Sequence, residues 1–550
     1  VWQQRPIISH LMLTDANVDM ERRADGLRNW RLVDPEDRGP GKVRVLTLQA
    51  ERTKLRFLNE AIELDMMAQA TPAETASQPK GKDALPSRLT FDGSYHGERF
   101  VAAGFAGSVL SFRESGLSFP LRGHLISGKT RIDVDGMFAD IFDPGAIDAT
   151  VRVAGPSLSR IHPFLAFQPP VSRPYVLEAQ IKQGDKAYTF AKLHGKVGDT
   201  DIAGEATYDR NAERPVAKVS LRSEVADLAD IIFLTGADYR ANGSFAHADT
   251  GRARARAGVA AAAPKRAAPG KRMRAFDAHL QLQLKKLKAA AVPMLESLRL
   301  AADLVDGTLK VTELDLGIAG GHITGALDYD GTVAHASLDA RNIRLERFVP
   351  TPPSSTTSTG AIRARLRMTG HGDSVTSVLA SAKGEVAAIV EGGRISNLVD
   401  AKLGLNVGKI IGLKFRGDRD IELTCGAAAF DFNNGIGKSQ VVLLETEQTH
   451  TDGAGTIDLR ERNIDLLLTP QPKNPGFLTL NSSIHVQGPL HKPGFKIEER
   501  VPLAPAGIVA PPAAVAAIFR PLLETRQAGG QCAAVLNAQG VQTRAVVVKK

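Results

Sequence analysis

The sequence predicts a mainly β fold: an elongated, curled antiparallel β-sheet groove built from repeated hairpin units, with few short helices. Three observations predict it. Polar and apolar residues alternate over many short segments, one stretch of the chain recurs at a fixed offset, and 51 glycines are spread through 550 residues. Frequent glycines are typical of turns and bulges. With 43% hydrophobic and 23% charged residues, the chain is expected to pack rather than remain disordered.

The alternation of polar and apolar residues is clearest in four segments, residues 131–135, 308–312, 323–329 and 463–466. The third segment (ITGALDY) follows the pattern if Ala326 is tolerated among the polar positions. Because successive side chains of a strand point to opposite faces, each segment has one apolar and one polar face. Such one-sided strands favour an antiparallel sheet with one face in water.

An internal repeat supports the hairpin units. Residues 201–209 (DIAGEATYD) align with residues 322–330 (HITGALDYD), with Ile, Gly, Tyr and Asp matching at an offset of 121. A looser third copy begins at Ile132. Each copy continues through a second strand to a Leu-x-x-Ile or Leu-x-x-Phe ending, which indicates stacked hairpins that share an apolar face. On the order of 25 strands spaced by about 4.8 Å would extend about 120 Å.

Composition divides the chain into four predicted regions. We predict an N-terminal β-groove region over 1–250, a basic disordered linker over 251–274, a C-terminal β region over 275–500, and a Pro/Ala-rich tail over 501–550. The tail is expected to contain a short helix near 513–524. Further helical patterns lie at 395–413, whose glycines disfavour a helix, and around 293–297.

The net charge of +9 comes almost entirely from residues 251–274, which hold eight basic and no acidic residues. The remainder is therefore close to neutral, which weakens any interpretation as a nucleic-acid-binding surface. The basic segment also lacks the interleaved aromatic residues that stack on single strands. It is either a solvated loop or a contact to anionic lipid headgroups.

No motif in the sequence supports catalysis or a cofactor. Residues 123–130 (GHLISGKT) fit the phosphate-loop formula, but the following residues alternate like a strand where a helix is required, so a hairpin turn is predicted. The thirteen histidines show no metal-ligand spacing, and no Gly-x-Ser-x-Gly elbow occurs. We therefore expect no enzyme activity, no metal and no cofactor. Cys425 and Cys532 could pair in an oxidising compartment or remain two buried thiols.

Several short segments resemble a known family in their order along the chain. Residues 393–398 (GRISNL), 453–459 (GAGTIDL), 463–467 (NIDLL), 472–475 (PKNP) and 484–488 (IHVQG) are similar to the C-terminal region of AsmA-family proteins. Residues 8–31, including DANVDME at 15–21, resemble the family's N-terminal β region, and residues 530–534 (GQCAA) resemble its tail.

The resemblance implies a periplasmic protein anchored to the inner membrane through an N-terminal helix. That helix is absent here, and because the first residue is Val1 rather than Met, we expect the true N-terminus to lie upstream. The family's likeness to bridge-like lipid-transfer proteins implies a β gutter that carries phospholipid or another envelope lipid toward the outer membrane, or supports outer-membrane assembly. The alternative is a structural or scaffolding envelope protein that limits or assists outer-membrane protein assembly without moving lipid.

A lipid carrier needs a continuous apolar surface, because an acyl chain leaving a membrane loses about 0.8 kcal/mol per CH₂ exposed to water. The apolar positions of the alternating segments are the candidates for this surface. They could equally fill the core of an ordinary β-sandwich. The candidates are Ile132, Val134, Ile202, Tyr208, Leu309, Val311, Ile323, Leu327, Tyr329, Ile464, Leu466, Ile484 and Val486.

Overall fold

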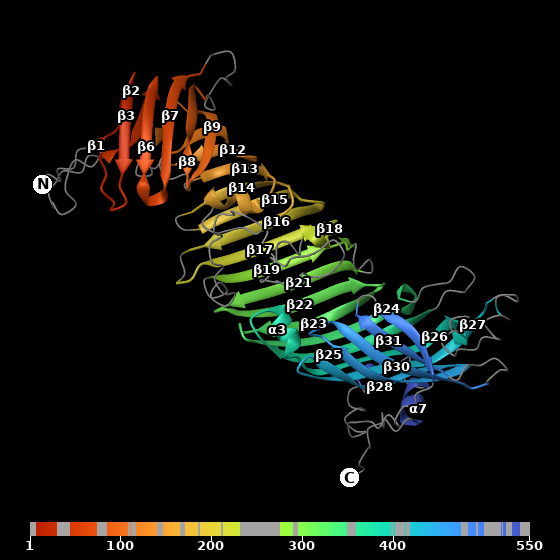
Figure 1. The fold of residues 1–550 in the computed structure, drawn as a ribbon. Coiled ribbons are helices and arrows are strands. Elements are labelled where there is room, and N and C mark those ends of the chain that lie inside the picture. Colours follow the sequence, from red (N-terminus) through yellow and green to blue (C-terminus); the bar gives the residue numbers. More distant parts are fainter. Residues whose placement is uncertain are drawn as a thin grey trace, which may run out of the picture. The chain divides into compact units, whose positions relative to one another are not determined.

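The computed structural model shows a mainly β protein with few short helices (Figure 1). Twenty-five strands of the described residues belong to one mixed, mostly antiparallel sheet formed largely by hairpins, which confirms the predicted fold class. The residues that the structure describes are 7–29, 44–73, 85–107, 110–111, 117–139, 147–164, 171–184, 187–210, 213–230, 276–289, 295–348, 359–397, 400–401, 413, 418–474, 482–490, 493–499, 519, 521–523 and 531–538.

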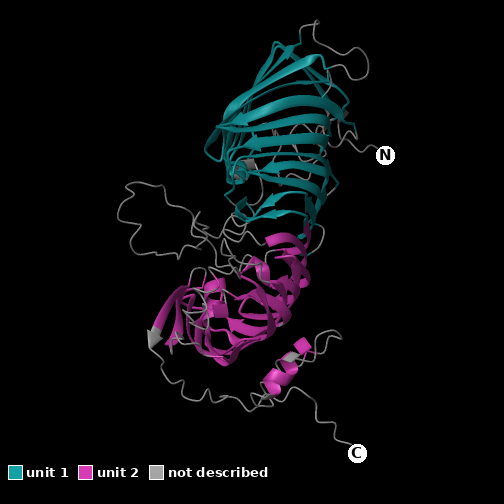
Figure 2. Ribbon diagram, turned by 90° about the vertical axis from the view of Figure 1, so that its right-hand side faces the viewer, with its two compact units in different colours: residues 1–260, 284–291 teal, residues 261–283, 292–550 magenta. Residues whose placement is uncertain are grey.

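The chain divides into two compact units (Figure 2). Unit 1 comprises residues 1–260 and 284–291, and unit 2 comprises residues 261–283 and 292–550. The predicted basic linker at 251–274 lies outside the described residues. Each unit contains its own run of sheet strands, so the faces of the sheet are described for each unit separately.

In unit 1 the strands of the main sheet follow one another in chain order after a parallel pair at its start. They are β3 (Asn17–Arg22), β6 (Thr53–Asn59), β7 (Leu64–Pro72), β8 (Ser87–Tyr95), β9 (Glu98–Ala106), β11 (Phe119–Ser127), β12 (Thr130–Phe138), β13 (Ile147–Gly155), β14 (Tyr175–Gln183), β15 (Ala187–Val197), β16 (Thr200–Asp209) and β17 (Val216–Ser223). Figure 2 shows these strands as a curled layer.

In unit 2 the same hairpin pattern continues from strand to strand. The strands are β19 (Asp277–Leu284, whose last residue belongs to unit 1), β21 (Leu295–Val305), β22 (Thr308–Ile318), β23 (Gly321–Tyr329), β24 (Val333–Arg344), β25 (Thr359–His371), β26 (Lys383–Ser396), β27 (Asp420–Asn433), β28 (Ile436–Thr446), β29 (Thr449–Asp458), β30 (Asn463–Pro472), β31 (Ser482–Pro489) and β32 (Gly494–Glu499).

The remaining described strands form only small sheets: β1 (Ile7–Ile8) with β4 (Arg44–Val45), β2 (Leu11–Thr14) and β10 (Leu110–Ser111) on either side of β5 (Thr47–Glu51), and β18 (Ala226–Asp227) with β20 (Leu287–Lys288). The helical elements whose bounds the structure describes are η1 (Glu60–Ile62), η4 (Leu158–Phe164), η6 (Leu345–Arg347), α3 (Val375–Ala380) and α7 (Gln531–Ala538).

One pair of the main sheet departs from the antiparallel pattern, because β3 pairs in parallel with β6. A parallel pair requires a crossover connection of a dozen or more residues rather than a tight turn. The segment between these strands supplies it and contains β4 and β5. The alternation of polar and apolar residues identifies a strand but not the direction of its partner, so the sequence did not reveal this exception.

The internal repeat and the residues that fit the phosphate-loop formula both form parts of β-hairpins. The two copies of the repeat lie in β16 and β23. Residues 123–130 span the end of β11, a two-residue turn at Gly128 and the first residue of β12, which confirms the predicted hairpin turn. The Leu-x-x-Ile and Leu-x-x-Phe endings form short helical turns, two of which are η4 and η6.

Buried aspartates fasten two helical turns that follow strands. In unit 1, Asp230 is buried and accepts hydrogen bonds from the backbone N–H and hydroxyl of Thr200, at 3.1 and 2.9 Å. In unit 2, buried Asp400 accepts hydrogen bonds from the hydroxyls of Thr446 (2.7 Å) and Thr449 (3.1 Å). A buried carboxylate must be hydrogen-bonded to be tolerated, so each one fixes a turn to the sheet.

Each of the three predicted helices is either corrected by the structure or lies partly outside the residues that the structure describes. Residues 295–297 begin strand β21, so the helix expected around 293–297 was wrong there. The helix expected from Ile395 starts later, because β26 runs to Ser396; of the following stretch only 397, 400–401 and 413 are described, and these are helical. In the tail, Phe519 and residues 521–523 are helical as expected, and the rest of 513–524 lies outside the described residues.

Candidate functional site

Every candidate groove residue of unit 2 lies on one face of the sheet. Residues directly opposite each other in neighbouring strands share a face. Leu309 is opposite Tyr329 and Val311 is opposite Leu327, while Ile323 follows the same parity on β23. From Leu327 the face passes across successive strands through Ala336, Met368, Gly384, Phe432, Gly437, Ile457 and Ile464. Leu466 on the same strand is opposite Val486, and Leu468 is opposite Ile484.

The four candidates of unit 1 also share one face. Ile132 is opposite Val153, Val153 is opposite Leu177, Leu177 is opposite Gly195, and Gly195 is opposite Ile202. Val134 lies two residues along β12 from Ile132, and Tyr208 lies six residues along β16 from Ile202, so both keep the same parity. Each unit therefore carries one apolar face, a name kept below for these surfaces.

The candidates are neither sealed in a core nor fully in water. Eleven of the thirteen are half-buried, and only Ile484 and Val486 are buried, with 8% and 7% of their surface exposed. The alternate residues of β23 are exposed, including Ala326, which confirms its place on the polar face. Among the described strands, the sheets outside the main one have two or three short strands, too few to form a second layer over an apolar face.

The side chains of the apolar face pack together in small clusters. Val134 packs beside buried Phe119 and Phe138, and Ile202 packs beside Tyr175 and Val197 under Ile161 of η4. Burial raises the pKa of Tyr175 to about 12. In unit 2, Ile323 packs against Ala340 and Ile343, and Leu466 against Ile484 and Val486. The surface is thus a series of shallow apolar clusters.

Sequence reasoning missed much of the face in the middle of unit 2. Leu366 is opposite Leu338 and Val386, and Val386 is opposite Phe430, so these residues continue the face between β23 and β30. The signal was present in residues 363–368 (RARLRM), where apolar residues alternate with three arginines. In β27 the signal is masked, because Cys425, Ala427 and Ala429 are apolar on the opposite face as well.

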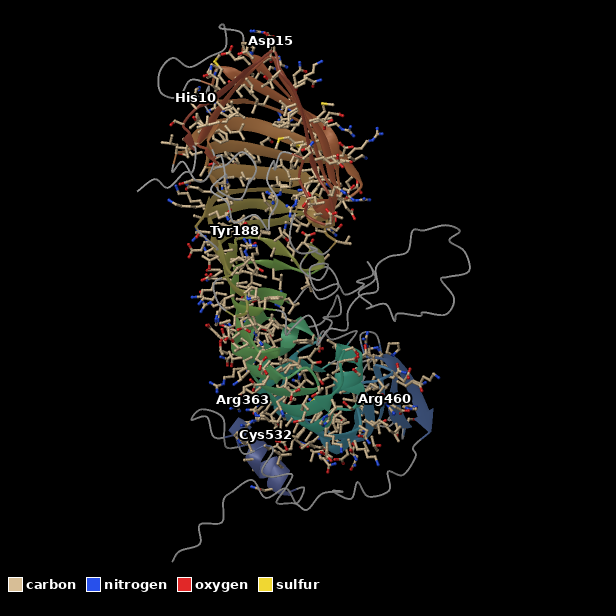
Figure 3. The ribbon with its side chains drawn as sticks, turned by 90° about the vertical axis from the view of Figure 1, so that its left-hand side faces the viewer. His10, Asp15, Tyr188, Arg363, Arg460 and Cys532 are labelled. Carbon is tan, nitrogen blue, oxygen red and sulfur yellow. A yellow bond between two sulfur atoms is a disulfide. The ribbon has the colours of Figure 1, made fainter. Side chains whose placement is uncertain are left out.

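That opposite face is covered by the C-terminal segment of unit 2. Helix α7 packs on β26, β27 and β28 through Leu536, and Phe519, Leu522 and Leu523 join the same buried cluster. Cys532 of α7 forms a disulfide with Cys425 of β27, with their Cα atoms 4.9 Å apart (Figure 3). Strands buried on both faces read as continuous apolar runs, which accounts for the sequence CGAAAF at 425–430.

Beside this helix, the opposite face carries an ion cluster around Glu445. Its carboxylate contacts His450 Nδ1 and Lys473 Nζ, each at 2.5 Å, and His450 Nε2 lies 3.0 Å from Asp452 Oδ2. Hydrogen bonding to Asp452 and to Glu445 raises the pKa of His450 to about 9 although burial opposes the charged form. The cluster balances two acids with two cations, so its role is to join β28, β29 and β30.

Because of His450, the free energy of unfolding is expected to fall as the pH rises. Its pKa lies above the ordinary value of 6.5, so its contribution is complete below pH 6.5 and is lost as the pH rises through about 9. With its side chain 20% exposed, we expect His450→Gln to cost about 1–2 kcal/mol near pH 6, after allowance for solvent screening. Urea titration of the wild type and the variant should show a smaller difference between their free energies of unfolding at pH 10 than at pH 6. His335→Gln is the exposed control. A difference that stays constant with pH would contradict this assignment.

No metal centre is found among the described residues. No group of three or more His, Cys, Asp and Glu side chains in this part of the chain could hold a metal ion. The imidazole of His485 lies 2.7 Å from the carboxylate of Asp465. In the described segments, no helix has both the length and the apolar character needed to span a bilayer.

Comparison with known proteins agrees with the fold. The AsmA family model matches residues 180–442. The chain is 24% identical over 471 residues to the AsmA family protein YhjG of Escherichia coli (strain K12), an alignment covering 82% of this chain and 68% of YhjG. The family is generally non-enzymatic. The matched residues include β15 to β27, the hairpins that form the repeat, and this part of the chain belongs to the AsmA family.

Proposed function

We propose that this AsmA-family protein is an envelope protein that carries lipid acyl chains along its apolar faces, supporting phospholipid transport to, or assembly of, the outer membrane. The observation that carries the proposal is the apolar face that continues from strand to strand between β22 and β31 in unit 2, on which most residues are half-buried. A sixteen-carbon chain exposed to water costs on the order of 10 kcal/mol. A face of this kind offsets that cost at every position, so a chain can slide without a single deep pocket.

The expected location is the periplasm, with attachment to the inner membrane. A gutter between two membranes must lie in the compartment that separates them, and a disulfide is stable in such an oxidising compartment. The bond between Cys425 and Cys532 supports this placement. Fractionation of cells that produce the full-length protein, with a cytoplasmic and a periplasmic marker, tests it directly.

The proposal is tested on β23, where one strand offers both faces. We expect a photo-crosslinking residue at Leu327 to attach to lipid in cells, and one at the neighbouring Ala326, on the polar face, not to do so. The double variant Ile323→Asp, Leu327→Asp should lose co-purified lipid by mass spectrometry. Its matched control is Thr324→Asp, Ala326→Asp, which adds the same charge to the exposed positions.

The crosslinking experiment remains informative even if the aspartate double variant does not fold. The aspartate double variant could unfold, which circular dichroism would show, but a residue that crosslinks at Leu327 leaves the strand apolar. Equal crosslinking at Leu327 and Ala326, or none at Leu327, would end the transport proposal. Folded aspartate variants that retain their lipid would end it as well.

A scaffolding role without lipid movement is the second candidate, and β32 favours it. Phe495 and Ile497 on this strand are 71% and 62% exposed, although they lie opposite the buried Val486 and Ile484. Exposed apolar residues near the end of a sheet suit the addition of a strand from another protein. Phe495→Ser with Ile497→Ser would then abolish function in cells while lipid crosslinking at Leu327 remains unchanged.

A further inference from the structure

At one end of β14, β15 and β16, the apolar face of unit 1 finishes in a row of polar-tipped side chains. Tyr188 is opposite Tyr208 on one side and Gln183 on the other, so all three side chains share the face that contains Ile202. All three are half-buried. The next pairs inward, Phe190 with Ala206 and Phe190 with Ile181, are apolar. The row therefore lies where an apolar surface meets water, and Figure 3 labels Tyr188 on these strands.

Arg210 brings a positive charge to this row. It follows Asp209 at the end of β16, and its guanidinium carbon lies 5.3 Å from the centroid of the Tyr188 ring. Its Nη2 donates a hydrogen bond to Tyr188 Oη at 3.3 Å, and the side chain is exposed. Because the Tyr188 oxygen accepts this bond, its own O–H remains a donor. The guanidinium has five N–H donors, so most are left for an anion.

Gln183 adds a polar group that the fold itself leaves unsatisfied. Its Oε1 is buried and has no hydrogen-bond partner among the described residues. A buried acceptor without a partner costs free energy and calls for a donor, which a hydroxyl of a lipid headgroup or water can supply. The amide Nε2 of Gln183 is the group that can donate to a phosphate oxygen. Strand alternation directs Asp209, the nearest acid in sequence, to the other face, since it pairs with Ala187 rather than Tyr188.

The equivalent positions of the internal repeat in unit 2 lack this arrangement of side chains. At the offset of 121, Tyr208 corresponds to Tyr329, Tyr188 to Leu309 and Arg210 to Gly331. The Tyr329 hydroxyl donates to the backbone carbonyls of Gly331 and Gly372, at 2.9 Å each. In the described part of unit 1, no such carbonyl bond holds the Tyr208 hydroxyl. The same strand position thus fastens the fold in unit 2, while the described residues of unit 1 leave the Tyr208 hydroxyl without such a bond.

We propose that Arg210, Tyr188, Tyr208 and Gln183 form a subsite for the phosphodiester headgroup of a phospholipid whose acyl chain lies over Phe190 and Ala206. This rests on the proposed lipid-carrying function and names the headgroup chemistry that it favours. Guanidinium groups bind phosphate oxygens through paired charge-assisted hydrogen bonds. Tyrosine suits the boundary because its ring is apolar and its hydroxyl polar. Together they select phosphorus-containing lipids over uncharged ones.

The test measures headgroup preference with two lipids that share their chains. Calorimetric titration of the full chain with dioctanoyl phosphatidylglycerol and with dioctanoylglycerol gives the ratio of their affinities. We expect the wild type to prefer the phospholipid by about tenfold, as one charge-assisted contact implies. Arg210→Gln should remove most of this preference, and Tyr208→Phe should lower it by about threefold.

Two controls separate the subsite from general effects. Lys218→Gln removes the same charge from an exposed position on the opposite face of β17 and should leave the preference unchanged. Glycerophosphoglycerol, which has the phosphodiester without acyl chains, is titrated to show whether the ligand is a lipid or a free phosphodiester.

Each outcome decides the proposal. Retained preference in Arg210→Gln, or equal loss in Lys218→Gln, overturns the subsite. Equal binding of the two lipids by the wild type overturns the subsite but leaves lipid carrying intact. If neither lipid binds, the carrying function fails too. Glycerophosphoglycerol that binds as tightly as the phospholipid overturns the assignment to lipid, because the acyl chain would then contribute nothing.

Discussion

Helix α7 is expected to leave the opposite face of unit 2 when the disulfide between Cys425 and Cys532 is broken. The bond closes a separation of 107 residues, for which the loss of loop-closure entropy predicts a stabilisation of about 4–5 kcal/mol. Leu536 and Phe519 remain as apolar contacts, but the segment must then hold its place by burial alone. We expect a local opening rather than global unfolding, because the strands keep their own hairpin partners.

Hydrogen exchange with and without a reductant measures this opening. Amides of residues 531–538 should exchange at least tenfold faster after reduction, and the double variant Cys425→Ala, Cys532→Ala should behave in the same way. The amides of β31, which lie outside the cluster, serve as an internal control. Unchanged protection of 531–538 would mean that the apolar contacts suffice. Lipid crosslinking at Leu327 should persist after reduction, since α7 covers the other face.

Alternation of polar and apolar residues allowed the fold class and the shared face of the candidates to be predicted from sequence. Residues 323–329 show why it works: each apolar side chain is half-buried and each intervening one is exposed, down to Ala326. The sequence keeps this two-residue period because a strand whose pairing register shifted by one residue would turn all its apolar side chains toward water.

The features that sequence missed depend on contacts between distant segments. The covering of β27 by α7 replaces alternation with an apolar run, and nothing local to residues 531–538 indicates which strands they cover. The pairing of the two cysteines stayed undecided because only the fold brings them together. Arg210 was missed for a related reason, since the polar tips beside it come from three strands. The domain boundaries and the lipid contacts of the candidates stay predictions.

Glycines on the apolar face are where single methyl groups should do the most damage. A Cβ at Gly325 would lie 2.1 Å from the carbonyl oxygen of Ser337, and one at Gly204, its equivalent in the repeat, 2.0 Å from that of Ser220. These are backbone atoms, so the neighbouring strand would have to move. In each hairpin the preceding strand also shifts register opposite the glycine, between Val311 and Leu314 in unit 2. The absent side chain therefore permits the close approach of the following strand, opposite a bulge in the preceding one.

We expect Gly325→Ala to cost about 2–4 kcal/mol, from overpacking and a displaced backbone together. Gly331→Ala is the matched control: its Cβ would meet nothing within 4 Å, so only its left-handed backbone opposes the change, at about 1 kcal/mol. Hydrogen exchange of β23 and β24 measures the local stability of each variant. Equal effects of the two substitutions would show that backbone conformation, rather than close strand approach, requires glycine here. A larger effect at Gly325 would instead mean that the bulged hairpins set the spacing of the face over which acyl chains are proposed to move.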